Sequence, residues 1–167
     1  KPAETQYPIH DVLRRRWSPR AYSERMVEME TLKSLFEAAR WAPSSNNEQP
    51  WHFIVVRERE TLRRLGESAR SGAYTAQAPL AIVVAVEQTP FAVSDGSLAI
   101  HAMMLTAWAE GIGSNWVGFA GRLEESWQAS QPRGRPVSSS NSRSGWPAAL
   151  RPTGTSISFG YLGEQVP

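Results

Sequence analysis

Residues 38–51 read Ala-Ala-Arg-Trp-Ala-Pro-Ser-Ser-Asn-Asn-Glu-Gln-Pro-Trp. Two prolines and five uncharged polar side chains fall between residues 43 and 50, which is typical of a loop. The apolar run Trp51–Val56 follows directly and predicts a strand. This part of the chain therefore predicts a polar loop held between two regular elements.

A helix is predicted immediately upstream of this loop. Its apolar residues recur at spacings of three and four, at Leu32, Leu35, Phe36 and Ala39. Thr31 is a plausible cap for its first turn. The residue before a proline disfavours helical backbone, so we expect the helix to end at Trp41 or Ala42.

On both sides of this region, the chain alternates between helical and strand patterns. The predicted elements are a short helix behind Pro8 that ends in Arg14, Arg15 and Arg16, a charged helix at 59–70, a strand at 80–86, an apolar helix at 98–109, and strands at 115–117 and near 157–161. The strand at 80–86 contains neither a charge nor an alternation, so we expect it to be central and covered on both faces. The helix at 98–109 is apolar nearly all round and stops at Gly111, which predicts a buried helix or a subunit interface. The order is mixed α and β.

Composition favours one soluble globular domain spanning residues 1–167. The chain is 41% hydrophobic and has no apolar run long enough for a membrane helix. Its 18 basic and 16 acidic residues give a formal charge of only +2, so bulk nucleic-acid binding is not implied. The lack of cysteine excludes disulfides and thiolate chemistry and favours a reducing cytoplasm. Residues 1–7 lack the apolar core of a signal peptide, so export is not expected.

Residues 126–156 differ from the rest of the domain. They are rich in Ser, Pro, Arg and Gly and show no period that predicts an element. A mobile surface insertion would have this composition, and so would a stretch read in an altered frame of a GC-rich gene. The sequence leaves both explanations open.

The first group of chemically informative residues is Arg16-Trp17-Ser18-Pro19-Arg20. Two guanidinium groups flank a hydroxyl within five residues, and the proline holds the turn so that they can converge. Arginine presents a planar fork of donors that matches phosphate oxygens. The motif therefore suggests a phosphate site, although by itself a solvated basic face fits it as well.

The second group is the polar loop itself, where Ser44, Ser45, Asn46, Asn47 and Gln49 offer donors and acceptors without charge. A flavin presents carbonyl and imide groups along its pyrimidine edge, which neutral amides and hydroxyls can recognise. An ordinary turn has the same composition, so the loop alone does not distinguish the two.

In order and spacing, these two groups resemble the nitroreductase family. That family has an Arg-x-Ser-x-Arg/Lys element near its N-terminus, followed by a helix ending in Ala-Pro-Ser-Ser-x-Asn-x-Gln-Pro-Trp. A third similarity is Gly111-Ile112-Gly113-Ser114-Asn115-Trp116-Val117-Gly118, which follows the apolar helix. The resemblance covers residues 9 to about 125, returns near 158–161 and fails across 126–156.

The resemblance implies an α+β fold, a three-layer α/β/α sandwich whose mainly antiparallel central sheet carries helices on both faces. It also implies a homodimer with FMN sites at the subunit interface. Arg16, Trp17, Ser18 and Arg20 would then hold the FMN phosphate and ribityl chain. The loop residues Pro43, Ser44, Ser45 and Asn47, with Gln49 as a further candidate, would contact the flavin of the partner subunit. Backbone groups of Trp116, Val117 and Gly118 would lie beside the ring.

The family also implies an activity, in which NADPH or NADH reduces the flavin and a nitroaromatic, quinone or other electron-poor small molecule then accepts the hydride by a ping-pong mechanism. No separate Gly-x-Gly-x-x-Gly site for the nicotinamide is present. We assign no catalytic side chain. Many relatives add a basic phosphate ligand near the C-terminus, and Arg151 is the last basic residue here and the candidate replacement.

Two other functions are compatible with parts of the sequence. A flavin-binding dimeric protein without efficient turnover would follow if 126–156 removes part of the pocket. A nucleic-acid module using residues 14–20 explains neither the uncharged loop nor the apolar helix.

The histidines His10, His52 and His101 lack acidic or cysteine partners at ligand spacing, so we expect no metal site.

Overall fold

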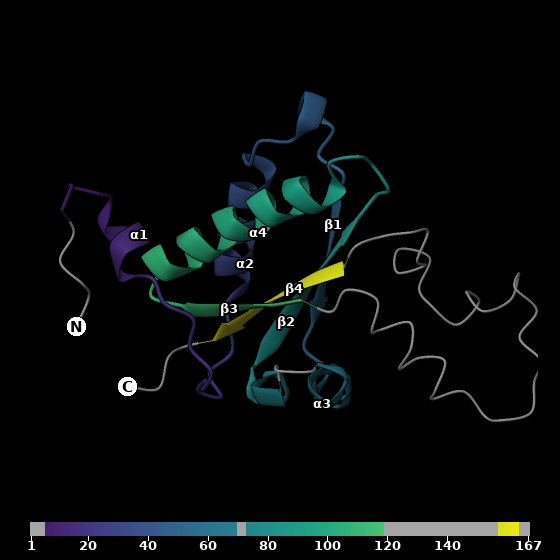
Figure 1. Cartoon of the computed structure of the whole chain (residues 1–167). Helices are drawn as coiled ribbons and strands as arrows, with labels where there is room; N and C mark the ends of the chain where they lie inside the picture. Colours follow the sequence, from purple (N-terminus) through teal and green to yellow (C-terminus); the bar gives the residue numbers. More distant parts are fainter. Residues whose placement is uncertain (1–5, 70–72, 119–156, 164–167) are drawn as a thin grey trace, which may run out of the picture.

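The computed structural model describes residues 6–69, 73–118 and 157–163. A sheet lies at the centre of the fold (Figure 1). The four strands found there are β1 (Trp51–Val56), β2 (Leu80–Val86), β3 (Gly113–Gly118) and β4 (Ile157–Gly163). Their order is β1-β2-β4-β3, and every neighbouring pair is antiparallel. Residues 126–156, including Arg151, lie outside the described residues.

The strand β2 is an inner strand, as its sequence predicts. All seven of its residues are buried, and they pair with β1 on one side and β4 on the other. Leu80, Ile82 and Val84 belong to one apolar cluster, whereas Ala81 and Val83 belong to another. Since successive side chains of a strand point to opposite faces, the sheet is covered on both sides.

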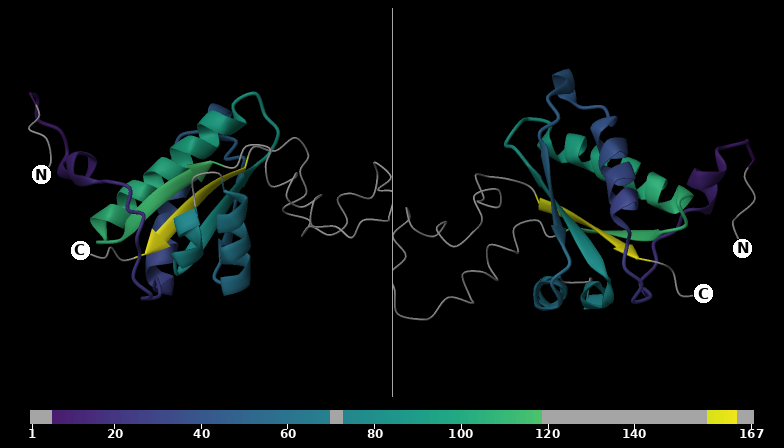
Figure 2. Two further views of the ribbon diagram at one scale, coloured as in Figure 1. Left: turned by 60° about the horizontal axis from the view of Figure 1, so that its bottom comes forward. Right: turned by 180° about the vertical axis from the view of Figure 1, so that it is seen from behind.

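Helices make up the two outer layers. The helices α2 (Met29–Arg40) and α4 (Ala92–Ala109) pack on the Ile82 face of the sheet. The helix α3 (Arg59–Ser68) and the 3-10 helix η2 (Ala73–Gln77) cover the opposite face (Figures 1 and 2). A short helix, α1 (Asp11–Arg15), lies beside α4. The three-layer arrangement and the antiparallel sheet are thus confirmed.

Two helix starts differ from the predictions. The N-cap of α2 is Glu28 rather than Thr31, and the helix itself ends at Arg40 with Trp41 as its C-cap. The helix α4 begins at Ala92, six residues before the apolar run at 98–109. Its first turns are mostly small or polar, but Ala92, Asp95 and Gly96 are buried. Packing of those turns on the core extends the helix beyond its obvious apolar run.

The C-terminal end of α4 agrees with the prediction. Gly111 has a φ of 79°, the left-handed conformation that commonly terminates a helix. The chain then enters β3, which starts two residues earlier than the predicted strand at 115–117. Among the described residues, no helix is both long enough and apolar enough to cross a membrane.

Candidate functional site

The turn after α1, residues 16–20, brings Arg16 and Ser18 together and is called the Arg16 turn below. Arg16 is the C-cap of α1 and has extended backbone, so the chain leaves the helix there. The Arg16 Nη1 donates to Ser18 Oγ over 3.2 Å, and both residues are half-buried. Arg14 and Arg15 instead pair with Asp11 on the helix. A guanidinium and a hydroxyl therefore share one place, as the motif predicts for a phosphate site.

Arg20 has a different neighbour. Its Cζ lies 6.0 Å from the centroid of the Tyr74 ring, which belongs to η2. Burial raises the pKa of Tyr74, and the nearby Arg20 charge opposes that rise. An aromatic face attracts a guanidinium at this distance, so η2 helps to place the second arginine of the motif. Nothing in the sequence pattern predicts this role for Tyr74.

A buried hydrogen bond joins the same turn to β3. Asn115 Nδ2 donates to the Pro19 carbonyl oxygen over 3.0 Å, and Tyr22 Oη donates to the same oxygen, also over 3.0 Å. Asn115 is 4% exposed and lies 96 residues from Pro19 in sequence. Two of the three groups predicted from sequence therefore lie together, although they are far apart along the chain.

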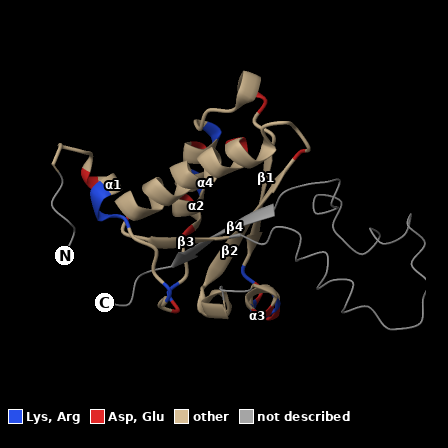
Figure 3. Cartoon of the chain, in the orientation of Figure 1, with Lys and Arg blue, Asp and Glu red and all other residues tan. Residues whose placement is uncertain are grey.

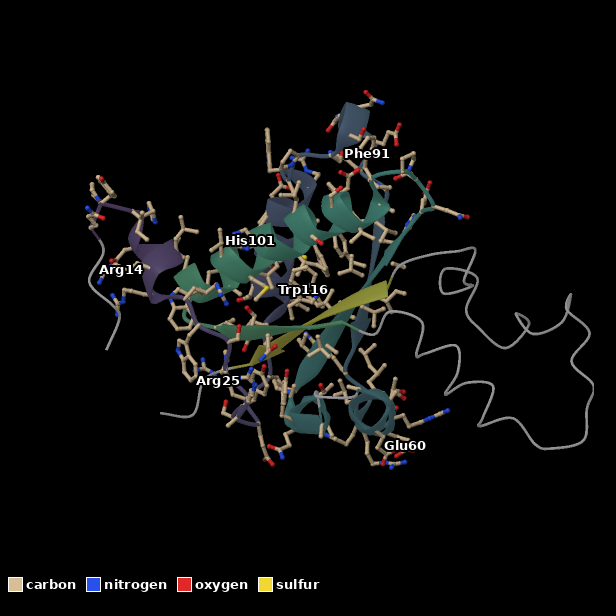
Figure 4. All side chains as sticks on the ribbon, in the orientation of Figure 1. Arg14, Arg25, Glu60, Phe91, His101 and Trp116 are labelled. Carbon is tan, nitrogen blue, oxygen red and sulfur yellow. The ribbon has the colours of Figure 1, made fainter. Side chains whose placement is uncertain are left out.

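The residues after Asn115 differ in exposure. Trp116 is 43% exposed, whereas Val117 is buried against the α3 side of the sheet. Figure 4 labels Trp116 on β3, beside α4. Gly118 ends the strand and pairs with Ser158 of β4. The strand thus carries one partly exposed ring, Trp116, directly after Asn115, which is bound to Pro19; Trp17 of the same turn is also exposed.

We predict that the two hydrogen bonds to the Pro19 carbonyl oxygen, which we call the Pro19 anchor, stabilise the folded chain. Asn115→Leu removes one donor to the Pro19 oxygen, and Tyr22→Phe removes the other. Because the other donor remains in each variant, each loss should lower the free energy of unfolding by about 0.5–1.5 kcal/mol. Urea unfolding of the two variants measures this. Ser34→Ala on the exposed side of α2 is the control, and equal stability of Asn115→Leu and the unmodified chain would contradict the anchor.

The polar loop has an unusual backbone. Asn46, Asn47 and Gln49 have φ values of 49°, 57° and 50°. These values lie in the left-handed region of backbone conformation, which residues other than glycine rarely adopt. The Gln49 backbone N–H donates to Ser44 Oγ over 3.0 Å. Gln49 Nε2 donates to the Arg40 carbonyl over 3.1 Å. These bonds hold the loop against the end of α2.

The loop is also bound to the first turns of α4. The Ser45 backbone N–H donates to Asp95 Oδ2 over 3.2 Å. Asp95 is 4% exposed. Sequence reasoning missed it, although a lone carboxylate in an otherwise uncharged 18-residue helix is a visible signal.

The polar loop and the Arg16 turn lie at opposite ends of α4 (Figure 1). The loop is bound near the N-terminal end of the helix, whereas α1 lies beside its C-terminal end. A helix of 18 residues is about 27 Å long. One chain therefore does not bring the loop to its own Arg16 turn.

The outward side of α4 is uncharged along the length of the helix. Val93 and Leu98 are 63% and 43% exposed, and Ser94 and His101 are also exposed. Asp95 is the only charged residue of α4, and it is buried. The remainder of the helix carries no Lys, Arg, Asp or Glu (Figure 3). His10 and His52 lie outside this helix. His10 Nδ1 accepts the Val12 backbone N–H at the start of α1, and His52 Nε2 lies 3.0 Å from Glu87 Oε1. An exposed helix face without charge is typical of a surface that another chain covers.

Comparison with known proteins gives the family. The model of the nitroreductase family matches residues 13–89. A protein of Archaeoglobus fulgidus named "Putative NADH dehydrogenase/NAD(P)H nitroreductase" is 42% identical over 65% of this chain and 66% of its own length. A protein of the same name from Methanothermobacter thermautotrophicus is 39% identical over 66% of this chain and 60% of its own.

A solved structure agrees with these sequence matches. The FMN-dependent nitroreductase of Clostridium difficile R20291 superposes with a TM-score of 0.70 and 28% identity, over 93% of this chain and 87% of that one. The matches to the two archaeal relatives span about two thirds of their lengths or less. Fold, motif order and sequence identity all agree, and the chain belongs to the nitroreductase family.

Proposed function

We propose that this chain is an oxidoreductase that binds FMN and passes hydride from NADPH or NADH to a nitroaromatic, a quinone or a similar electron-poor acceptor. The observation that carries the proposal is the Asn115 bond to Pro19, which fixes the Arg16 turn beside β3. This bond ties the turn that carries Arg16 and Ser18 to the strand β3, whose Trp116 is 43% exposed. The names of the relatives given above support the same activity.

The donors of the Arg16 turn and of the polar loop fit the parts of FMN. Arg16 and Ser18, which already share one hydrogen bond, would hold the phosphate, and Arg20 would contribute a second positive charge. Backbone groups of Trp116, Val117 and Gly118 would lie along the ring. The polar loop from Pro43 to Gln49 offers only neutral donors and acceptors, apart from the exposed Glu48. Such groups suit the pyrimidine edge of the ring.

We also propose that two copies form the site together. Pairing α4 with its copy in the antiparallel sense would place the N-terminal end of one helix near the C-terminal end of the other. The polar loop of one chain would then meet the Arg16 turn of its partner. A twofold axis brings the same surface of both chains together, so an uncharged face can cover itself. The resemblance implies the same contribution of Pro43, Ser44, Ser45, Asn47 and Gln49 to the neighbouring site.

When bound, FMN would supply the redox chemistry, by accepting hydride and returning it. The chain would then position groups rather than provide an acid or a base. Nicotinamide and acceptor would use one exposed face in turn, which gives ping-pong kinetics.

Purification tests this proposal directly. The protein should be yellow or become yellow with added FMN, release FMN on denaturation, and lose its absorbance near 450 nm when NADPH or NADH is added without oxygen. Colourless protein that FMN does not load would contradict flavin binding. Yellow protein that neither nicotinamide bleaches would instead support a flavin-binding dimer without turnover.

A further inference from the structure

We infer that Asp95 is a positioning residue for flavin binding, and that it acts on the site of the partner subunit. The inference rests on the function and the dimer proposed above. Asp95 Oδ2 accepts the Ser45 backbone N–H over 3.2 Å, across 50 residues of sequence. The carboxylate is 4% exposed. Placing such a group in the interior is costly unless it is hydrogen-bonded, so its presence there calls for a specific role.

The loop that Asp95 contacts does not adopt a relaxed backbone. Three of its non-glycine residues, Asn46, Asn47 and Gln49, have positive φ. Such conformations persist only where surrounding contacts enforce them, and they are frequent at ligand sites. The conformation of this loop therefore depends on the hydrogen bonds that hold it.

Those bonds come from two different elements. Gln49 bonds to Ser44 and to the carbonyl of Arg40, and so ties the loop to itself and to α2. The Ser45 bond to Asp95 ties it to α4. Because α4 carries the uncharged face that we propose for dimer contact, Asp95 links the loop to the interface. The loop is then presented to the partner at a fixed position relative to α4.

The test compares substitutions that keep or remove the acceptor. Asp95→Asn keeps an oxygen that the Ser45 N–H can reach. Asp95→Leu has a similar shape without an acceptor, and Asp95→Ala is made as a second variant in case leucine does not fold. Glu67→Ala, which removes an exposed carboxylate from α3 on the opposite face of the sheet, is the control. The Kd for FMN is measured by quenching of FMN fluorescence, with size-exclusion chromatography to confirm that each variant stays dimeric.

We expect Asp95→Leu and Asp95→Ala to weaken FMN binding on the order of tenfold to a hundredfold, and Asp95→Asn to remain within a few-fold of the unmodified chain. Unchanged Kd values in the leucine and alanine variants would overturn the inference. An equal loss in the asparagine variant would also overturn it, because an amide oxygen can still accept the bond.

Mixed dimers test whether the effect crosses the interface. A chain with Asp95→Leu is combined with a differently tagged chain carrying Arg16→Ala and Arg20→Ala. If the loop serves the partner, one site of the mixed dimer has both defects and the other has none. The mixed dimer should then bind one FMN with the affinity of the unmodified protein. Two weakened sites and no intact one would show that Asp95 acts within its own chain, whereas failure of the unmodified dimer to bind FMN would contradict the proposed function instead.

Discussion

Leu98→Arg is expected to separate the proposed dimer and to abolish FMN binding in one step. Leu98 is 43% exposed on the uncharged outward side of α4, so the substitution does not disturb the core of the chain. In a twofold dimer it would place an unpaired charge from each copy in the same interface. Leaving a charge buried without a partner costs about 3–5 kcal/mol, which corresponds to a loss of roughly a hundredfold to several thousandfold in association.

Light scattering after size-exclusion chromatography measures the mass, and absorbance near 450 nm measures FMN per chain. Arg64→Glu is the control, because it reverses an exposed charge on α3, on the opposite face of the sheet. That variant should remain a yellow dimer. A Leu98→Arg protein that is monomeric, well folded and still binds FMN at full affinity would contradict a site shared between two chains.

The strands β1 and β2 were predictable because their ends are marked in the sequence. Trp51–Val56 lies between Pro50 and Arg57, and the structure gives the strand those bounds. The uncharged run at Leu80–Val86 is buried throughout, as its composition requires. Helix starts are harder, because the first turn of a helix is often exposed. Met29 and Glu30 of α2 are both exposed and therefore add nothing to the apolar period on which the prediction rested.

The arrangement of the candidate site was predictable only in part. The local pairing of Arg16 with Ser18 follows from their two-residue spacing. The contacts of Asn115 with Pro19 and of Asp95 with Ser45 span 96 and 50 residues, and no local pattern fixes such pairs. The placement of Arg20 on Tyr74 is of the same kind. The residue types of the candidate site were visible in the sequence, whereas the residues that hold those side chains in place were not.

Replacing both arginines of the turn, Arg16→Ala together with Arg20→Ala, is expected to weaken FMN binding by roughly 100-fold to 20,000-fold. Each charge-assisted hydrogen bond to a phosphate contributes about 1.5–3 kcal/mol, and a tenfold change in affinity corresponds to about 1.4 kcal/mol. The affinity that is lost should be the part that comes from contacts with the phosphate. Binding of riboflavin, which has no phosphate, should change little when it is measured by the same fluorescence titration.

The neighbouring pair Arg14→Ala and Arg15→Ala gives a closely matched control. It removes the same charge from the same part of the chain, but these two side chains are bound to Asp11 on α1. If the two double variants lost FMN affinity equally, general electrostatic attraction would explain the binding and no specific phosphate site would be needed. If Arg16→Ala with Arg20→Ala weakened riboflavin as much as FMN, the arginines would be acting on the loop or the ring instead of the phosphate. A large loss confined to FMN and to this pair is the result that a phosphate site at the Arg16 turn requires.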